Sequence, residues 1–287
     1  MTDRRSPTQN QPSAISNPQS TIVVKLGGTE GVDFAAACQD AAGLLAAGRR
    51  LVLVHGGSAE ANALGEALDE PPRFITSPSG YTSRYTDRRT LEIFVMAVNG
   101  KVNTLLVESL QAFGVNALGL SGLDGRLLVA QRKEAVVSVE DGKRKVIRDD
   151  YTGKIETVNA ALLGALLEAG TLPVVAPLAV GEKGEALNVD ADRAAAMIAA
   201  ALGAEALVLL TAAPGLLRRF PDESSLIENL PRRQLEEALE LAQGRMKKKV
   251  LGASEALVGG VGRVIIADGR VARPISAALD GGGTHIT

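Results

Sequence analysis

The chain has 287 residues, of which 46% are apolar, 22% are charged and only 3% are aromatic. Such a composition indicates a globular protein with a sizeable core, and it argues against a protein that binds nucleic acid by stacking bases on aromatic side chains. The 31 basic and 33 acidic residues give a net charge of −2, which excludes a general electrostatic attraction to nucleic acid or to an anionic membrane.

The first twenty residues are rich in Pro, Ser, Gln and Asn, and they lack the apolar stretch of a signal peptide. No apolar run approaches the ~20 residues of a membrane-spanning helix. We therefore expect a cytoplasmic protein in which residues 1–20 form a disordered extension. The single cysteine, Cys38, excludes an intramolecular disulfide, and the two histidines are too few for a multi-histidine metal site.

Two short apolar runs begin the part of the chain that we expect to be ordered. Residues 21–26 and 50–55 are rich in Val and Leu, as buried parallel strands are, and each run is followed by a pair of glycines. Further strands are predicted at residues 115–120, 173–177, 207–211 and 264–267, and helices at 32–47, 58–68, 88–113, 157–169 and 194–202. Within the long helix, Asn99-Gly100 is a local weakness.

Strands that alternate with helices predict an α/β protein with a mainly parallel sheet that is covered on both faces. The segment from about residue 125 to 156 differs, because its short alternating runs around Glu140-Asp141-Gly142 predict an antiparallel β-hairpin that stands off the main sheet. A second lobe is expected from about residue 181. In parallel sheets ligands bind beyond the carboxyl ends of the strands, and here those ends carry the glycines. The sequence therefore predicts a small-molecule site.

The glycine pairs Gly27-Gly28 and Gly56-Gly57 stand at predicted strand-to-helix turns. Glycine lets the backbone approach an anion, and the N-terminus of the next helix offers unpaired N–H groups to it, although tight turns often require glycine for steric reasons alone. Lys25 favours anion binding, because a charged side chain within an apolar strand needs a partner and a phosphate is a natural one. Neither pair fits the phosphate-loop motif or the dinucleotide-binding motif.

Two later segments leave a structural and a functional interpretation open. Asp190 or Asp192 could be the N-cap of the helix that follows them. The run over 244–250, Gly-Arg-Met-Lys-Lys-Lys-Val, could be the solvated face of a helix. We interpret His55 as a packed residue at a strand end rather than as a base, and Cys38 as a thiol buried on a helix.

Taken in order, the segments around Lys25, Gly57, Asp192 and Lys249 resemble those of the amino acid kinase family, in its acetylglutamate kinase branch. The resemblance covers essentially the whole chain after its first twenty residues. It implies a three-layer αβα sandwich with a mainly parallel central sheet and a β-hairpin that protrudes over the acceptor site. It also implies transfer of the γ-phosphoryl group of ATP to a side-chain carboxylate, with Mg²⁺ held by phosphates and water and with no protein ligand to the metal.

The resemblance assigns roles to individual residues. Asp192 is expected to hold Lys25 and Lys249 in place, since two close cations need an anion between them. The residues implied in catalysis are Lys25, Asp192 and Lys249. Those implied in ATP binding are Lys25, Gly27, Gly28, Thr211, Gly215 and Lys249, and those implied in acceptor binding are Gly56, Gly57, Arg84 and Asn188. Residues 21–180 become an acceptor-binding lobe and residues 181–287 a nucleotide-binding lobe.

A narrower resemblance rests on three segments, at residues 83–87, 149–154 and 242–250. They are similar to those of kinases of lysine biosynthesis that act on 2-aminoadipate bound to LysW, a small acidic carrier protein. This resemblance implies LysW as a partner, and a homodimeric enzyme.

Several alternatives stay open at this point. The acceptor could be LysW-bound glutamate, which is one methylene shorter and feeds arginine synthesis, or free N-acetylglutamate, as in an N-acetylglutamate kinase. A ligand-binding module that lost its chemistry is a further alternative, and the retained lysines and Asp192 argue against it. The missing dinucleotide motif argues against a nicotinamide dehydrogenase.

The predicted hairpin carries a cluster of positive charge. Residues 143–148, Lys-Arg-Lys-Val-Ile-Arg, contain four cations in six positions. One interpretation is a sheet edge that is protected from pairing by its charge. The other is a docking strip for an acidic carrier whose C-terminus lies in the acceptor site, since local positive charge speeds and orients association with an anionic partner.

Overall fold

An eight-stranded, mainly parallel sheet forms the centre of the protein. The computed structural model describes residues 20–28, 31–78, 80, 82–140, 143–242 and 244–287, so the extension expected over residues 1–20 lies almost wholly outside the described residues. In spatial order the strands are β14 (Asn229–Leu230), β16 (Thr284–Ile286), β15 (Arg263–Asp268), β13 (Ala206–Thr211), β1 (Thr21–Leu26), β2 (Arg50–His55), β10 (Leu172–Ala176) and β5 (Ala117–Ser121). β15 and β16 run antiparallel, and the other neighbours in this sheet are parallel.

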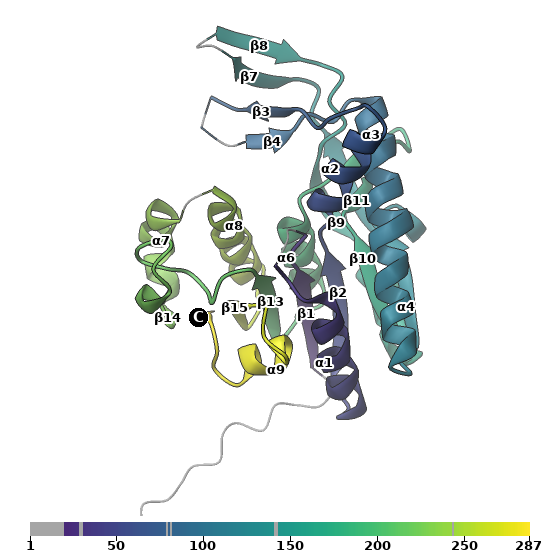
Figure 1. Ribbon diagram of the computed structural model, residues 1–287. Coiled ribbons are helices and arrows are strands. Elements are labelled where there is room, and N and C mark those ends of the chain that lie inside the picture. Colours follow the sequence, from purple (N-terminus) through teal and green to yellow (C-terminus); the bar gives the residue numbers. More distant parts are fainter. Residues whose placement is uncertain (1–19, 29–30, 79, 81, 141–142, 243) are drawn as a thin grey trace, which may run out of the picture.

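Helices cover both faces of this sheet, as the alternating side chains of its strands require (Figure 1). In β1, Val23 belongs to one apolar core, whereas Ile22 and Val24 belong to the other. The helices that contribute to the core around Val23 are α5 (Ala160–Glu168), α6 (Ala191–Ala201), α7 (Leu235–Leu241) and α8 (Gly244–Val258), and those on the opposite face are α1 (Phe34–Ala46), α4 (Thr104–Ala112) and α9 (Pro274–Leu279). The predicted three-layer α/β sandwich is confirmed.

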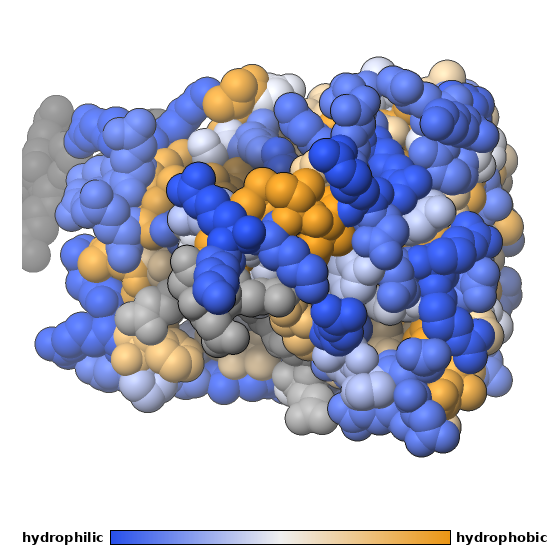
Figure 2. Space-filling model, turned by 90° about the horizontal axis from the view of Figure 1, so that it is seen from above, coloured by the Kyte–Doolittle hydropathy of each residue, from blue (hydrophilic) through white to orange (hydrophobic). Residues whose placement is uncertain are grey.

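A smaller sheet and two β-hairpins extend one end of the protein. The smaller sheet contains β12 (Ala186–Asn188), β11 (Leu178–Val180), β6 (Leu128–Arg132) and β9 (Gly153–Val158), and the hairpins are β3 (Phe74–Thr76) with β4 (Thr82–Arg84) and β7 (Val136–Glu140) with β8 (Lys143–Ile147). The β7–β8 hairpin is the predicted one, and Ile75, Tyr85 and Ile147 pack the two hairpins together. Both lie above the carboxyl ends of β1 and β2 (Figure 1), and Figure 2 shows a mostly hydrophilic surface on this side, with a hydrophobic patch in it.

The long helix predicted over 88–113 forms, and it contains a wider turn. α3 (Arg88–Val95) continues into a π-helical segment, η1 (Met96–Asn103), and then into α4. The predicted weakness at Asn99-Gly100 lies within the π-helical segment. By length and composition alone, the helix from Arg88 to Ala112 is apolar enough to cross a membrane, but 44% of its most apolar stretch is buried inside the protein.

The start of one helix departs from the prediction, and several short strands were not predicted, namely β3, β4, β11, β12, β14 and β16. Thr157 and Val158, which were expected to begin a helix, extend β9 and pair with β6 instead. Asn159 then caps α5 by accepting a hydrogen bond from Leu162 N at 3.2 Å, so strand pairing and the cap together move the helix start. β16 was not predicted, because three residues after a run of glycines carry too little local pattern to identify a strand.

A buried carboxylate ties the first helix to the last. Asp40 of α1 is only 6% exposed, and it accepts hydrogen bonds from the backbone N–H groups of Ile275 at 2.7 Å and Ser276 at 2.8 Å. These two groups belong to the first turn of α9, where backbone donors have no partner within the helix. Asp40 therefore caps α9 from another element.

Replacing Asp40 with Ala is expected to lower the free energy of unfolding by about 3 kcal/mol, because two buried backbone donors lose their acceptor. Urea denaturation of the wild-type protein and the variant at neutral pH measures the change. The control is Gln39→Ala, at an exposed position on the same helix. A loss no larger than that of the control would contradict the capping role of Asp40.

Candidate active site

The two glycine turns that follow β1 and β2 lie against each other. The strands are neighbours, so Gly27-Gly28 and Gly56-Gly57 leave the sheet side by side, and Ala59 N donates to Gly28 O at 3.2 Å. A Cβ atom on Gly28 would lie 2.6 Å from Gly56 Cα, and one on Gly56 would lie 2.7 Å from Gly28 Cα. This close approach of two backbones therefore requires glycine on both sides.

A helix N-terminus adjoins the second glycine turn. α2 (Ser58–Ala67) has Gly57 as its N-cap residue, which has no side chain to accept from the N–H groups of the first turn. Backbone N–H groups at such a helix end attract anions. The two turns and the helix N-terminus are therefore suited to a phosphoryl group or a carboxylate.

Close to the first glycine turn, two lysines share one carboxylate. Lys25 of β1, Asp192 of α6 and Lys249 of α8 are 5%, 8% and 6% exposed. Lys25 Nζ lies 2.9 Å from Asp192 Oδ1, and Lys249 Nζ lies 3.0 and 3.1 Å from the two carboxylate oxygens of Asp192. The structure brings together the three residues predicted for catalysis. The interpretation of residues 244–250 as a solvated helix face is wrong for Lys249, because this side chain is buried.

Local structure fixes the position of Asp192. Asp190 is the N-cap of α6, and its Oδ1 accepts from Asp192 N at 3.0 Å and Arg193 N at 3.1 Å. The capping role therefore falls to Asp190, and the Asp192 side chain remains for the lysines. Two contacts join α6 to α8. A Cβ atom on Gly252 of α8 would lie 3.4 Å from Asp192 O of α6, and Arg193 Nε of α6 donates to Glu255 Oε2 of α8 at 2.9 Å. These contacts hold α8 close against α6.

The lysine–aspartate cluster carries a net positive charge in a buried place. Burial raises the pKa of Asp192, but Lys249 and Lys25 outweigh this effect and hold the pKa well below its usual value, so the carboxylate stays ionised. Burial lowers the pKa of Lys249 to about 8, although Asp192 opposes the change. Two ammonium groups and one carboxylate leave an excess positive charge, whose cost in solvation a bound anion would offset. The cluster is therefore suited to an anionic ligand.

Arg84, the predicted acceptor-binding arginine, reaches from β4 to the first turn of α2. Its Nη2 donates to Ser58 O at 3.3 Å and also to Asn62 Oδ1. Its guanidinium lies 5.3 Å from the centroid of the Phe74 ring. Burial lowers the pKa of Arg84. Because Gly57 directly precedes α2, the guanidinium lies near the second glycine turn.

Two of the segments that carry the narrower resemblance dock onto each other. Tyr85 Oη donates to Asp149 Oδ2 at 2.7 Å, and Tyr151 N donates to Thr86 O at 2.6 Å. Burial, together with the hydrogen bond to Asp149, raises the pKa of Tyr85 to about 12. β4 is thereby joined to the chain that leads into β9.

Thr86 also connects Arg84 to Asn188, the other predicted acceptor residue. Asn188 Nδ2 donates to Thr86 Oγ1 at 3.1 Å, and Thr86 Oγ1 donates to Arg84 O at 3.2 Å. The buried carboxylate of Asp150 accepts from Thr86 N at 3.1 Å and from Thr152 N at 2.8 Å. Sequence reasoning missed Thr86 and Asp150 as neighbours of the predicted acceptor residues. The available signal was their place in the two docked segments.

The remaining predicted nucleotide-binding residues lie at the end of β13 and in the loop after it, and β13 lies beside β1. Thr211 is the half-buried last residue of β13. Gly215 packs against Thr284 of β16 and against Leu226. A Cβ atom on Gly215 would lie 2.6 Å from Thr284 Oγ1 and 2.7 Å from Leu226 Cδ1. Packing alone therefore requires glycine at position 215, and its contact with a nucleotide stays a prediction.

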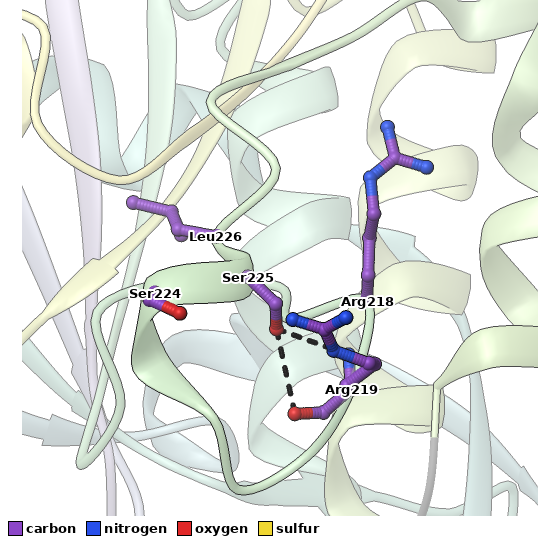
Figure 3. A pocket seen from close by; sticks show the side chains of 5 residues that line it. All are labelled: Arg218, Arg219, Ser224, Ser225 and Leu226. Atoms are coloured by element: carbon purple, nitrogen blue, oxygen red, sulfur yellow. Dashed lines mark hydrogen bonds between the residues drawn. The ribbon is translucent and has the colours of Figure 1, made fainter.

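A cavity of about 290 Å³ lies further along the loop that follows β13 (Figure 3). The residues that line it are Arg218, Arg219, Ser224, Ser225 and Leu226. Arg219 N donates to Ser225 Oγ at 3.0 Å, which closes the loop on itself. The lining contains none of the predicted site residues, so the cavity adds no support to the predicted site.

The two residues that we interpreted as packed are buried. Neither His55, at the end of β2, nor Cys38, on α1, has exposed surface. Burial raises the pKa of the Cys38 thiol, which disfavours the reactive thiolate. The packed position of both residues is confirmed.

Comparison with known proteins identifies the family. The model of the amino acid kinase family matches residues 20–268. The chain belongs to the amino acid kinase family. This amino acid kinase is 59% identical to the [LysW]-aminoadipate kinase of Deinococcus radiodurans over 266 residues, which are 93% of this chain and 91% of that protein. It is 58% identical to the [LysW]-aminoadipate kinase of Thermus thermophilus over 267 residues, 92% of this chain and 99% of that protein. Among solved structures, N-acetylglutamate synthase from Neisseria gonorrhoeae is similar with a TM-score of 0.76 and 29% identity, over 93% of this chain and 59% of that one.

The lowered pKa of Lys249 predicts how the stability of this amino acid kinase depends on pH. The folded protein binds this proton less tightly than the unfolded chain, so stability rises as the pH increases from about 8 to 10.5. We expect the free energy of unfolding of the wild-type protein to increase over this range relative to that of Lys249→Met. Urea denaturation at a series of pH values, with Lys248→Met as the control, measures the difference. A difference that stays constant would contradict the prediction.

Proposed function

We propose that this amino acid kinase transfers the γ-phosphoryl group of ATP to the side-chain carboxylate of LysW-bound 2-aminoadipate, in lysine biosynthesis. The observation that carries the chemistry is the buried cluster of Lys25, Asp192 and Lys249 beside the paired glycine turns. The acceptor is proposed from the two relatives named [LysW]-aminoadipate kinase. In the proposed substrate, an isopeptide link to the C-terminal glutamate of LysW masks the amine, and the product is an acylphosphate.

This reaction needs charge stabilisation rather than proton transfer. The acceptor carboxylate is already ionised at neutral pH, so one of its oxygens attacks the γ-phosphorus, the bond to the β–γ bridging oxygen breaks, and ADP leaves without the removal of a proton. Lys25 and Lys249 are proposed to contact the phosphoryl oxygens and to stabilise their charge in the transition state. Asp192 is a poor base because its pKa is low. Its proposed role is to hold the two ammonium groups in position.

The nucleotide is proposed to lie along the first glycine turn and the end of β13. Without side chains, the backbone of Gly27 and Gly28 can approach the β- and γ-phosphates, while Thr211 and Gly215 lie toward the nucleoside. Mg²⁺ would supply further positive charge for the phosphates. In the described part of the chain, no group of three or more His, Cys, Asp or Glu side chains could hold a metal ion. Phosphate oxygens and water are therefore the proposed ligands of Mg²⁺.

The acceptor is proposed to lie along the second glycine turn. Gly56 N already donates to Leu26 O at 3.0 Å, so Gly56 contributes through its missing side chain and Gly57 through its N–H group. The fork of Arg84 suits the α-carboxylate of the substrate, and Asn188 would bind on the same side. In this arrangement residues 21–180 form most of the acceptor side and residues 181–287 most of the nucleotide side. Lys25, Gly27 and Gly28 cross to the phosphates, and Asn188 crosses to the acceptor.

The proposed function predicts an ATP- and Mg²⁺-dependent acylphosphate on the carrier-linked substrate. Hydroxylamine traps an acylphosphate as a hydroxamate, so LysW carrying 2-aminoadipate should yield a hydroxamate in the complete reaction and none without ATP. LysW carrying glutamate and free N-acetylglutamate are the comparison substrates, because one methylene is worth only about 1–3 kcal/mol of discrimination. Hydroxamate formed from free N-acetylglutamate alone would contradict the carrier-bound acceptor.

The lysine–aspartate cluster is expected to act on turnover more than on nucleotide affinity. Lys25→Ala and Lys249→Ala should each lower kcat by roughly 10²-fold or more, because each removes charge stabilisation from the transferring group. Asp192→Asn should lower kcat by letting the two lysines separate, and Lys248→Ala is the control. Steady-state kinetics measure kcat and the KM for ATP. A Lys249→Ala enzyme with near-normal kcat would remove Lys249 from the site.

The basic strand β8 is the proposed docking strip for LysW. Lys143, Arg144, Lys145 and Arg148 are exposed in the protein, on or directly after β8, in a chain whose net charge is slightly negative. The β7–β8 hairpin packs on the β3–β4 hairpin, which carries Arg84. A carrier whose C-terminus enters the acceptor site would therefore have its body near this strand. Positive charge there favours an acidic partner.

Charge reversal at Lys143, Arg144 and Lys145 is expected to raise the KM for the carrier-bound substrate several-fold and to flatten its dependence on salt, while the ATP parameters barely change. Steady-state kinetics over a range of ionic strength measure both effects. Charge reversal at Arg232 and Arg233, two exposed arginines elsewhere on the chain, is the control. An unaltered KM at low ionic strength would mean that the carrier docks elsewhere.

We also propose that the kinase is a homodimer and that it acts in the cytoplasm. Met96, Leu105 and Phe113 are exposed on or directly after the long helix, and Leu118 is exposed on β5, the strand at the sheet edge. α4 packs beside β5, so these apolar side chains offer a surface to a second copy. The cytoplasmic assignment rests on the use of ATP as phosphoryl donor.

A further inference from the structure

His55 is a buried residue with a hydrogen-bond partner at each ring nitrogen. It ends β2 and directly precedes the second glycine turn. Its Nδ1 lies 2.7 Å from Gly56 O, and its Nε2 lies 2.9 Å from Asn103 Nδ2. Burial lowers the pKa of His55 to about 4, although the hydrogen bond to Gly56 opposes the change, so the ring is neutral at neutral pH. The proposed reaction gives this ring no role as a base.

Asn103 determines which nitrogen of the ring carries the proton. Asn103 Nδ2 lies 2.9 Å from His55 Nε2 and also 2.9 Å from Val174 O. A carbonyl oxygen only accepts, so the amide nitrogen of Asn103 faces Val174 and its second N–H donates to Nε2. Nε2 is therefore the acceptor, and Nδ1–H donates to Gly56 O.

The π-helical segment brings Asn103 to this position. Asn103 is the last residue of η1 and is buried against β5, where a Cβ atom on Gly119 would collide with its side chain. Earlier in the same segment, Val98 packs on the glycine turn, because a Cβ atom on Gly57 would lie 2.6 Å from Val98 Cγ1. η1 therefore supports the second glycine turn directly through Val98, and through His55 by way of Asn103.

We propose that His55 is a positioning residue for the acceptor, because its Nδ1-protonated ring, fixed by Asn103, sets the direction of the Gly56–Gly57 peptide. The C=O and N–H groups of a trans peptide point in opposite directions, so a Gly56 carbonyl held by His55 directs the Gly57 N–H away from the buried ring. This inference rests on the proposed function, in which the turn receives the acceptor carboxylate. A misdirected donor impairs the alignment of the carboxylate and leaves the nucleotide contacts intact.

The tautomer is tested on the wild-type protein without any substrate. In protein labelled with ¹⁵N in its histidine rings, the NMR spectrum should show His55 with a protonated Nδ1 and an unprotonated Nε2 throughout neutral pH. The chain has one other histidine, His285, so His285→Gln assigns the signals. An Nε2-protonated or charged His55 ring would overturn the inference whichever acceptor the kinase uses, so this failure is separate from a failure of the proposed function.

Two conservative variants separate positioning from packing. In His55→Asn, the amide of the introduced side chain occupies the place of the ring Nδ1 and keeps a donor for Gly56 O. In His55→Gln, the amide lies near the place of Nε2, so that donor is lost. We expect His55→Gln to lower kcat/KM for the acceptor by about tenfold or more, and the KM for ATP to change by less than about twofold. His55→Asn should lie several-fold above His55→Gln, and His285→Gln should match the wild type.

Thermal unfolding of the same proteins shows whether each variant is folded. Equal losses of kcat/KM in the two His55 variants would assign His55 a structural role only and would overturn the proposal. A loss that affects the KM for ATP as much as that for the acceptor would do the same.

Discussion

The sharing of one buried carboxylate by two lysines is the interaction on which the rest of this structure depends. Lys25 and Lys249 repel each other in a place from which water is largely excluded, and Asp192 is the anion that lets both remain charged. The three residues come from β1, α8 and α6, so the packing of two helices on the sheet must bring their side chains within hydrogen-bond distance. The excess positive charge costs solvation in the free protein, and in the proposed function this charge binds the phosphoryl group.

The second constraint is the close approach of two backbones at the carboxyl ends of β1 and β2. Glycines at 28 and 56 let the turns touch, and the contacts of His55, Asn103 and Val98 hold the second turn from behind. On the side of the proposed acceptor, Thr86 connects Arg84 and Asn188 through hydrogen bonds. The lysine–aspartate cluster, the paired glycine turns and the contacts of Arg84 are therefore each held by residues that are distant in the sequence. Phosphoryl transfer needs such positioning, because it requires little covalent chemistry from the protein.

Local patterns predicted the core strands and the layered fold, because burial on both faces of a parallel strand leaves a plain apolar run. A lysine is conspicuous in such a run, so the pattern also predicted that Lys25 needs a partner, which in the structure is Asp192. The same reasoning could not choose between Asp190 and Asp192, since the choice depends on where α8 packs. Thr86, Asp150 and Asn103 were missed for a similar reason: their partners lie far away in the sequence, and each residue is unremarkable in its own segment. The start of α5 was misplaced because Thr157 and Val158 follow their pairing with β6 rather than helix propensity.

The most direct test of the central claim is a crystal structure of the kinase with ADP, Mg²⁺ and aluminium fluoride, which mimics a phosphoryl group in transfer. The account predicts fluoride ligands within hydrogen-bond distance of the Nζ atoms of both Lys25 and Lys249, with Asp192 still between the two lysines and making no contact with the fluoride. A phosphoryl mimic bound away from the two lysines, or coordinated by Asp192 itself, would contradict the account.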